Sequence, residues 1–92
     1  MKLGGILDLR ILLGKNVKYY RFRTGLTQEQ LAEKINVSAN YIGRLERGQH
    51  NPSLAKLELI ANILSIEPYE LLIKHSGIDR IPNRIKITTR NN

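Results

Sequence analysis

Apolar residues recur every three or four positions over most of this chain, a spacing that predicts α-helices rather than strands. The first helix is expected from about Leu13 to Thr24, with Gly25 behind it as a stop signal. One side of this helix carries, at helical spacing, Val17, Tyr20, Arg21 and Thr24. The pattern favours a packed helical domain.

Capping residues predict where the next helices begin and end. Thr27 and Gln30 form a capping box, which opens a helix that ends at Asn36. The buried stripe of that helix would consist of Leu31, Ala32 and Ile35. Ser38 caps a third helix, and Gly48 ends it after residue 47.

Two more helices are expected in the second half of the chain. Ser53 caps the fourth helix. Its expected core face consists of Leu54, Leu57, Ile60, Ala61 and Leu64. Glu67 and Pro68 begin a fifth helix that runs to about Lys74, with proline at the first helical position.

These elements define one small domain between two extensions. We expect a compact all-α domain of five helices over residues 13–74, an N-terminal extension over 1–12 and a basic C-terminal tail over 75–92. The N-terminal extension suits either an extra helical turn or an arm. In the tail, Ile85 and Ile87 alternate with basic residues, so an edge strand and a disordered segment both fit.

The helix predicted over residues 38–47 separates its side chains into two faces. Ile42 and Leu45 lie on the inner face, at about 100° per residue. The outer face carries Ala39, Asn40, Gly43, Arg44 and Arg47. A glycine inside a helix costs roughly 0.5–1 kcal/mol relative to alanine. A freely solvated face has no reason to bear that cost, whereas a face that lies close to another surface does.

The outer face suits the major groove of DNA, which is about 12 Å wide and admits an α-helix. Ala39 and Gly43 would give the helix axis room to approach the bases. Arg44 suits guanine as a bidentate partner, and Asn40 suits adenine. We therefore predict these four residues as base contacts.

A specific family resemblance supports this interpretation. The run from residue 28 to 47, QEQLAEKINVSANYIGRLER, resembles the helix-turn-helix of the phage repressor and Cro-like family, also called the xenobiotic-response-element type. The family's apolar places are filled by Leu31, Ile35, Val37, Ile42 and Leu45. Ala32 is the small residue where the two helices touch, and Asn36 replaces the usual glycine of the turn. The flanking runs RTGLTQEQLA and ERGQHNPS also look like family signatures.

The resemblance covers about residues 13–74 and implies a repressor-like DNA-binding domain with its helix-turn-helix at the second and third helices. It implies a structural salt bridge between Arg21 and Glu46. It also gives Gln28 a role in gripping a phosphate and bracing the base-reading helix, which the anion affinity of a helix N-terminus supports. The other expected phosphate contacts are Tyr41, Arg47, Lys15, Arg23 and Gln49.

Charge favours a polyanionic partner. The chain has 15 Lys and Arg against 8 Asp and Glu, for a net charge of +7, concentrated at its two ends. It has no cysteine, which fits a cytoplasmic protein. Asp8 and Arg10 interrupt the N-terminal apolar run, so neither a signal peptide nor a membrane-spanning helix is expected.

Catalytic chemistry is not expected. The two histidines, His50 and His75, lie far apart in the sequence without cysteine or helical partners, which argues against a metal site. No serine–histidine–aspartate set, phosphate-binding glycine loop or carboxylate pair is recognisable. We therefore expect neither an enzyme nor a cofactor.

The fourth and fifth helices carry apolar residues off the core stripe. These residues are candidates for a homodimer contact, and packing inside the chain is an equal alternative. The candidates are Leu59, Ile63, Tyr69, Leu72 and Ile73.

Two functional hypotheses follow. The first is a sequence-specific transcriptional regulator, most simply a repressor that binds double-stranded DNA as a dimer on a palindromic operator. Glu29 and Glu33 could then face RNA polymerase. The alternative is an antitoxin or protein-interaction module of the same fold, whose tail binds a partner protein.

Overall fold

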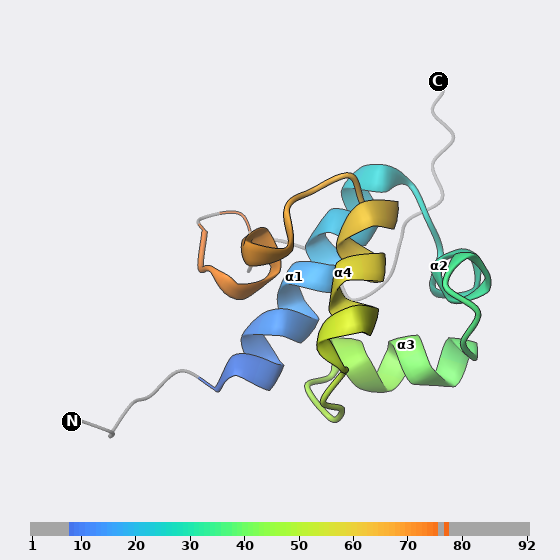
Figure 1. The fold of residues 1–92 in the computed structure, drawn as a ribbon, viewed down its shortest axis with the longest axis horizontal. Coiled ribbons are helices and arrows are strands. Elements are labelled where there is room, and N and C mark those ends of the chain that lie inside the picture. The colour runs from blue at the N-terminus through green and yellow to red at the C-terminus, as the bar shows by residue number, and fades with distance from the viewer. Residues whose placement is uncertain (1–7, 76, 78–92) are drawn as a thin grey trace.

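The computed structural model describes residues 8–75 and residue 77, which form a helical domain (Figure 1). Its elements in chain order are α1 (Leu9–Thr24), α2 (Gln28–Lys34), α3 (Ala39–Glu46), α4 (Leu54–Ile63) and the 3₁₀-helix η1 (Pro68–Leu72). The all-α class is confirmed. Predictions for residues 1–7 and for the tail after residue 77, including the strand, lie outside the described residues.

Helix α1 begins four residues earlier than the sequence pattern predicted. Asp8 is its N-cap, and the Asp8 Oδ1 accepts a hydrogen bond of 3.0 Å from the Arg10 backbone N–H. Leu12 is buried with the core. The extra helical turn was therefore the correct alternative for residues 9–12, and the boundary expected after residue 12 falls inside α1.

Local capping sets the starts of α2, α3 and α4 as predicted, whereas α2 ends at Lys34 and α3 at Glu46, slightly before the predicted ends. Thr27 Oγ1 accepts from the Gln30 N–H at 3.0 Å, and Gln30 Oε1 accepts from the Thr27 N–H at 2.8 Å. Ser38 and Ser53 each accept from a backbone N–H three residues later at 3.0 Å. Asn36 has a φ of 60°, so it adopts the left-handed conformation that the family usually gives to glycine.

The expected fifth α-helix is instead η1, a 3₁₀-helix that ends at Leu72 rather than at Lys74. Ile73 is extended, with φ −116° and ψ 153°. The side-chain amide of Asn16 donates to the backbone oxygens of Leu71 and Ile73, at 2.8 and 2.9 Å. These bonds hold the chain in its extended course and stop the helix from continuing.

All five elements contribute to one core. Its fully buried large side chains include Val17, Leu31, Ile35, Ile42, Leu45, Ile60 and Leu71. The buried stripe of α4 begins at Leu57, whereas Leu54 is 79% exposed, so its predicted core position is wrong. Leu54 is the first residue of α4 and lies beyond the end of the stripe.

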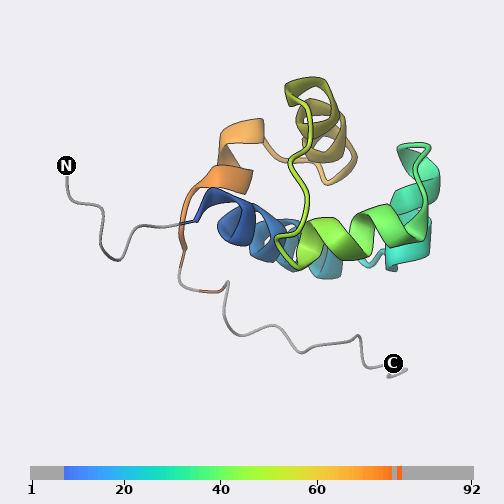
Figure 2. The ribbon, with the colours of Figure 1, turned by 90° about the horizontal axis from the view of Figure 1, so that it is seen from below.

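Helix α3 lies along an outer edge of the domain, with its N-terminal end beside α2 (Figure 1). Its C-terminal end meets α1, as the view from below also shows (Figure 2). Gly14 allows this contact, because a Cβ built there would lie 2.5 Å from the backbone oxygen of Leu45 and 2.7 Å from the backbone oxygen of Glu46. The position of α3 is therefore fixed by direct contact with the α1 backbone.

Candidate nucleic-acid interface

The turn between α2 and α3 brings the two helices into the helix-turn-helix arrangement. The Val37 N–H donates to the Ala32 oxygen at 3.0 Å, which closes the end of α2 around Asn36. Leu31 and Ala32 from α2 pack in one cluster with Ile42 and Leu45 from α3. The inner face of α3 is thus buried, and its other side is available for contact.

The outer face of α3 is polar and mostly exposed. Asn40, Arg44 and Arg47 are exposed and Ala39 is half-buried. Gly43, predicted on the same open face, is buried. A Cβ at Gly43 would lie 3.2 Å from Arg47 Nη1 and 3.9 Å from Gln28 Oε1. Two long side chains therefore cover Gly43, so its small size makes room for them within the protein.

Gln49 connects the two exposed arginines of this face. Its side-chain oxygen accepts from Arg47 Nε at 3.3 Å, and its backbone oxygen accepts from Arg44 Nη2 at 3.4 Å. Gly48 precedes it with a φ of 75° and packs against Ile11, so that the chain turns back at the end of α3. The turn places Gln49, a predicted phosphate contact, next to Arg44 and Arg47.

A buried network braces α3 from behind, and it includes the predicted salt bridge. Arg21 Nε and Nη2 donate to the two carboxylate oxygens of Glu46 at 2.6 and 3.0 Å. Both side chains are almost fully buried, at 5% and 4% exposure. Gln28 Nε2 also donates to Glu46 at 3.1 Å, and Arg21 Nη1 donates to the Leu26 oxygen at 2.9 Å. Gln28 therefore joins the start of α2 to the end of α3.

Tyr41 lies on the side of α3 that faces the α3–α4 loop. Its ring packs edge-on against the ring of His50, with centroids 4.6 Å apart. Burial raises the pKa of Tyr41 above its ordinary value. The hydroxyl therefore stays protonated at neutral pH and can donate a hydrogen bond to a phosphate.

The two predicted phosphate contacts on α1 have different surroundings. Lys15 is exposed, one residue after the glycine at which α1 meets α3. Arg23 instead donates to the Tyr19 hydroxyl at 3.0 Å and lines a pocket beside the α4–η1 loop. The structure groups Arg23 with that loop rather than with α3.

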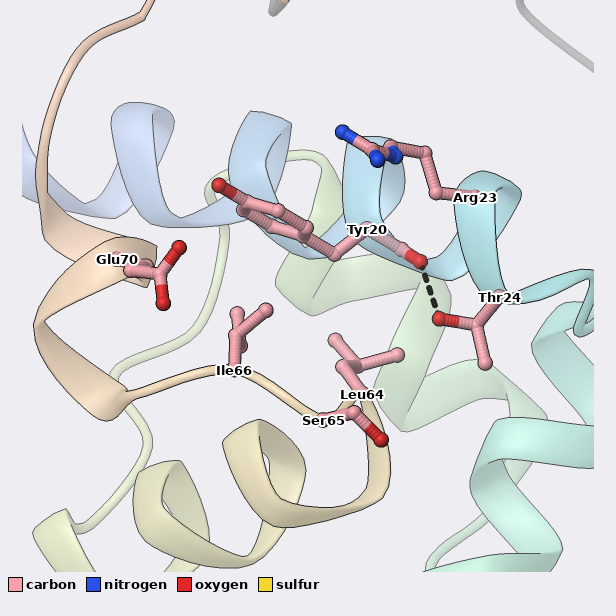
Figure 3. A pocket seen from close by; sticks show the side chains of 7 residues that line it. All are labelled: Tyr20, Arg23, Thr24, Leu64, Ser65, Ile66 and Glu70. Atoms are coloured by element: carbon pink, nitrogen blue, oxygen red, sulfur yellow. Dashed lines mark hydrogen bonds between the residues drawn. The ribbon is translucent and has the colours of Figure 1, made fainter.

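This pocket has a volume of about 370 Å³ and is lined by Tyr20, Arg23, Thr24, Leu64, Ser65, Ile66 and Glu70 (Figure 3). Several of its polar groups already bind within the chain. Thr24 Oγ1 donates to the backbone oxygen of Tyr20 at 2.7 Å, and Glu70 Oε2 accepts from the Glu67 backbone N–H at 3.0 Å. Burial, followed by the charge of Glu70, raises the pKa of Tyr20. The Thr24 and Glu70 side chains of the lining are therefore already engaged within the fold.

Four of the five candidate dimer residues have large exposed areas. Leu59, Tyr69, Leu72 and Ile73 are 38%, 63%, 38% and 45% exposed. Ile63 is half-buried and packs against the core. The exposed apolar surface formed by these four residues, here called the η1 surface, covers parts of α4 and η1.

Two residues that position the site were not predicted from the sequence. Gly14 sets the approach of α1 to α3, and Asn16 binds the end of η1. The signal was present, because glycine and asparagine are both weak helix formers and stand two positions apart inside the predicted first helix.

Other classes of site have little support within residues 8–75 and 77. No group of three histidine, cysteine or acidic side chains in this part of the chain could hold a metal ion. No helix there is long and apolar enough to cross a membrane.

Known proteins share both this sequence pattern and this fold. The helix-turn-helix family matches residues 17–71. The immunity repressor protein of Bacillus phage phi105 is 46% identical over 55 residues, which cover 60% of this chain and 38% of the repressor. The restriction-modification controller protein C.AhdI from Aeromonas hydrophila superposes with a TM-score of 0.64 at 39% identity, over 67% of this chain and 90% of the controller.

A further structural relative is found in a complex of the proteins SinR and SinI, with a TM-score of 0.61 and 34% identity over 65% of this chain and 59% of that one. The family match includes the segment that holds α2 and α3. Because the family match spans more than half of the chain, the protein belongs to the helix-turn-helix family of DNA-binding transcriptional regulators, which are not enzymes.

Proposed function

We propose that this protein is a sequence-specific repressor that binds a palindromic operator as a homodimer and acts in the cytoplasm. The observation that carries this proposal is the outer face of α3. Asn40, Arg44 and Arg47 are exposed there, while the Arg21–Glu46 pair holds the helix from behind. A braced helix with exposed amide and guanidinium groups suits the edges of bases in a major groove.

The side chains on and around the outer face of α3 fall into two groups, proposed base readers and proposed phosphate contacts. Arg44, in the second half of α3, and Asn40, near its start, are the proposed base readers, with Ala39 keeping the helix close to the groove and Gly43 leaving room for Arg47. Arg47, Gln49, Gln28 and Tyr41 surround this face and are the proposed phosphate contacts, and Lys15 extends them onto α1. Arg23 has the weakest support, because it binds Tyr19 beside the α4–η1 loop.

Replacing Arg44 with alanine should lower the affinity for a selected operator by about 1–3 kcal/mol and relax the preference at one base pair of each half-site. Arg47→Ala is the matched comparison, because it removes an equal charge from a proposed phosphate contact. It should weaken binding to all duplexes alike and reduce the slope of log affinity against log salt by about 0.9. Fluorescence anisotropy titrations with operator and random duplexes measure both effects. Equal losses of Arg44→Ala on the two duplexes would rule out base reading.

The η1 surface is the proposed dimer contact. One recognition helix covers only a few base pairs, whereas a two-fold dimer reads two half-sites about 34 Å apart. Leu59, Leu72 and Ile73 expose apolar area that a second copy would remove from water. Ile63 would support this contact from its half-buried position.

A protein partner is the second candidate function. One structural relative comes from a solved complex of two proteins, SinR and SinI. The exposed carboxylates of Glu29 and Glu33 on α2 offer a further surface, in this proposal for RNA polymerase. The basic segment after residue 75 offers another, for an antitoxin-like interaction.

Deleting residues 76–92 tests whether the sequence preference resides in the helical domain or depends on the tail. The repressor proposal predicts that the shortened chain keeps its preference for the selected operator, with a uniform loss of affinity at low salt because positive charge has been removed. Titrations of the full-length and shortened chains against operator and random duplexes provide the measurement. A shortened chain without sequence preference would contradict base reading by α3 alone.

A further inference from the structure

Asn16 occupies an unusual position for a polar side chain. It is fully buried in the middle of α1. Its Nδ2 donates two hydrogen bonds, to the Leu71 oxygen at 2.8 Å and to the Ile73 oxygen at 2.9 Å. These two oxygens stand at the end of η1, where backbone carbonyls lack helical partners. One side chain therefore satisfies both carbonyls and fixes the point at which the chain leaves η1.

Burying the Asn16 side chain also costs folding free energy, which an apolar side chain at this position would avoid. Its Oδ1 is buried without a hydrogen-bond partner. A buried polar atom left unpaired destabilises the folded state, so a leucine would fill this position in an ordinary core more favourably. The benefit of Asn16 is its grip on two specific backbone oxygens.

Those oxygens flank the centre of the η1 surface. Leu72 lies between them, and Ile73 carries the second of them. Both side chains are exposed. The bonds from Asn16 therefore determine where Leu72 and Ile73 stand relative to α1.

The opposite side of α1 holds the recognition helix. Gly14 precedes Asn16 by two residues, which is about 200° around an α-helix. At Gly14 the α1 backbone touches the backbone of Leu45 and Glu46 at the end of α3. Helix α1 is thus a rigid link between α3 and the η1 surface.

We infer that Asn16 is a positioning residue that sets the distance and angle between the two recognition helices of the dimer, and thereby the half-site spacing that the protein accepts. This inference rests on the proposed function, since it requires two copies that meet through the η1 surface. Asn16 touches neither the DNA nor the other copy. It acts by holding the end of η1 at a fixed place on α1.

A set of duplexes with two selected half-sites tests this role. Their centres are one helical turn apart, or one or two base pairs closer or further, and a further duplex carries a single half-site. Wild-type protein should bind best at one spacing. Asn16→Ala should lower that preference about tenfold, a change of 1.4 kcal/mol, while leaving affinity for the single half-site unchanged.

Val17→Ala is the matched control, because it destabilises the same helix by truncating a buried apolar side chain, which cannot hydrogen-bond to the backbone oxygens of Leu71 and Ile73. It should keep the wild-type spacing preference. Asn16→Ser retains one donor, so it should be more stable than Asn16→Ala and should reduce the preference partially; it replaces Asn16→Ala in the titrations if the alanine variant fails to fold. Circular dichroism verifies folding before each titration.

Two results would overturn the role of Asn16. One is a folded Asn16 variant with the wild-type spacing preference, and the other is an equal loss of preference in Val17→Ala. Failure of the proposed function is visible separately in the wild-type protein, which would then show no advantage for two half-sites over one.

Discussion

Gly14→Ala is expected to destabilise the domain by about 3 kcal/mol, the upper end of the usual cost of overpacking. The added methyl group would lie 2.5 Å from the Leu45 oxygen and 2.9 Å from the Glu46 carbonyl carbon. These are backbone atoms of α3, which cannot rotate away as a side chain would. For a domain of this size, the loss corresponds to a fall in melting temperature of about 12–24 °C, measured by circular dichroism.

Gly25→Ala is the control for this experiment. Gly25 has a φ of 80°, but apart from its own atoms and those of its chain neighbours nothing lies within 4 Å of the site of its missing Cβ. Its substitution therefore reports backbone strain alone, which costs about 1–2 kcal/mol. If Gly14→Ala melts no lower than Gly25→Ala, the close approach of α1 to α3 is not the constraint described above.

Arg21→Ala is expected to have the second large effect, a loss of about 3–5 kcal/mol in the free energy of unfolding. Glu46 is 4% exposed in the structure, and the substitution leaves its carboxylate with Gln28 as the one remaining side-chain donor among the described residues. It also removes the donor to the Leu26 oxygen at the end of α1. Urea unfolding followed by circular dichroism measures the change.

The double variant Arg21→Met with Glu46→Leu is the informative comparison. It removes both charges and replaces them with apolar side chains, so it should recover much of the stability lost in Arg21→Ala. An Arg21→Ala protein with unchanged stability and weaker DNA binding would contradict the structural role and make Arg21 a phosphate contact.

The features that sequence predicted correctly are mostly local. Thr27, Ser38 and Ser53 cap helices through backbone groups three residues away, so the sequence alone contains both partners. The Arg21–Glu46 pair joins residues 25 positions apart, and only the family resemblance suggested it.

The features that sequence missed depend on distant partners. The end of η1 is set by Asn16, which precedes Leu71 by 55 residues, so helical periodicity alone predicted a longer fifth helix. Gly43 is buried because Gln28 comes from another helix and Arg47 folds back along α3. A helical wheel treats one helix in isolation and cannot include such covering side chains.

Selection of bound fragments from a random duplex library tests the central claim most directly, namely that α3 reads base edges in a two-fold dimer. The proposed function predicts enrichment of a pseudo-palindrome whose half-sites lie about one DNA turn apart. Arg44→Ala should lose the preference at one symmetric pair of positions in that sequence. Recovery of no enriched sequence, or of an asymmetric site bound by a single copy, would contradict the claim.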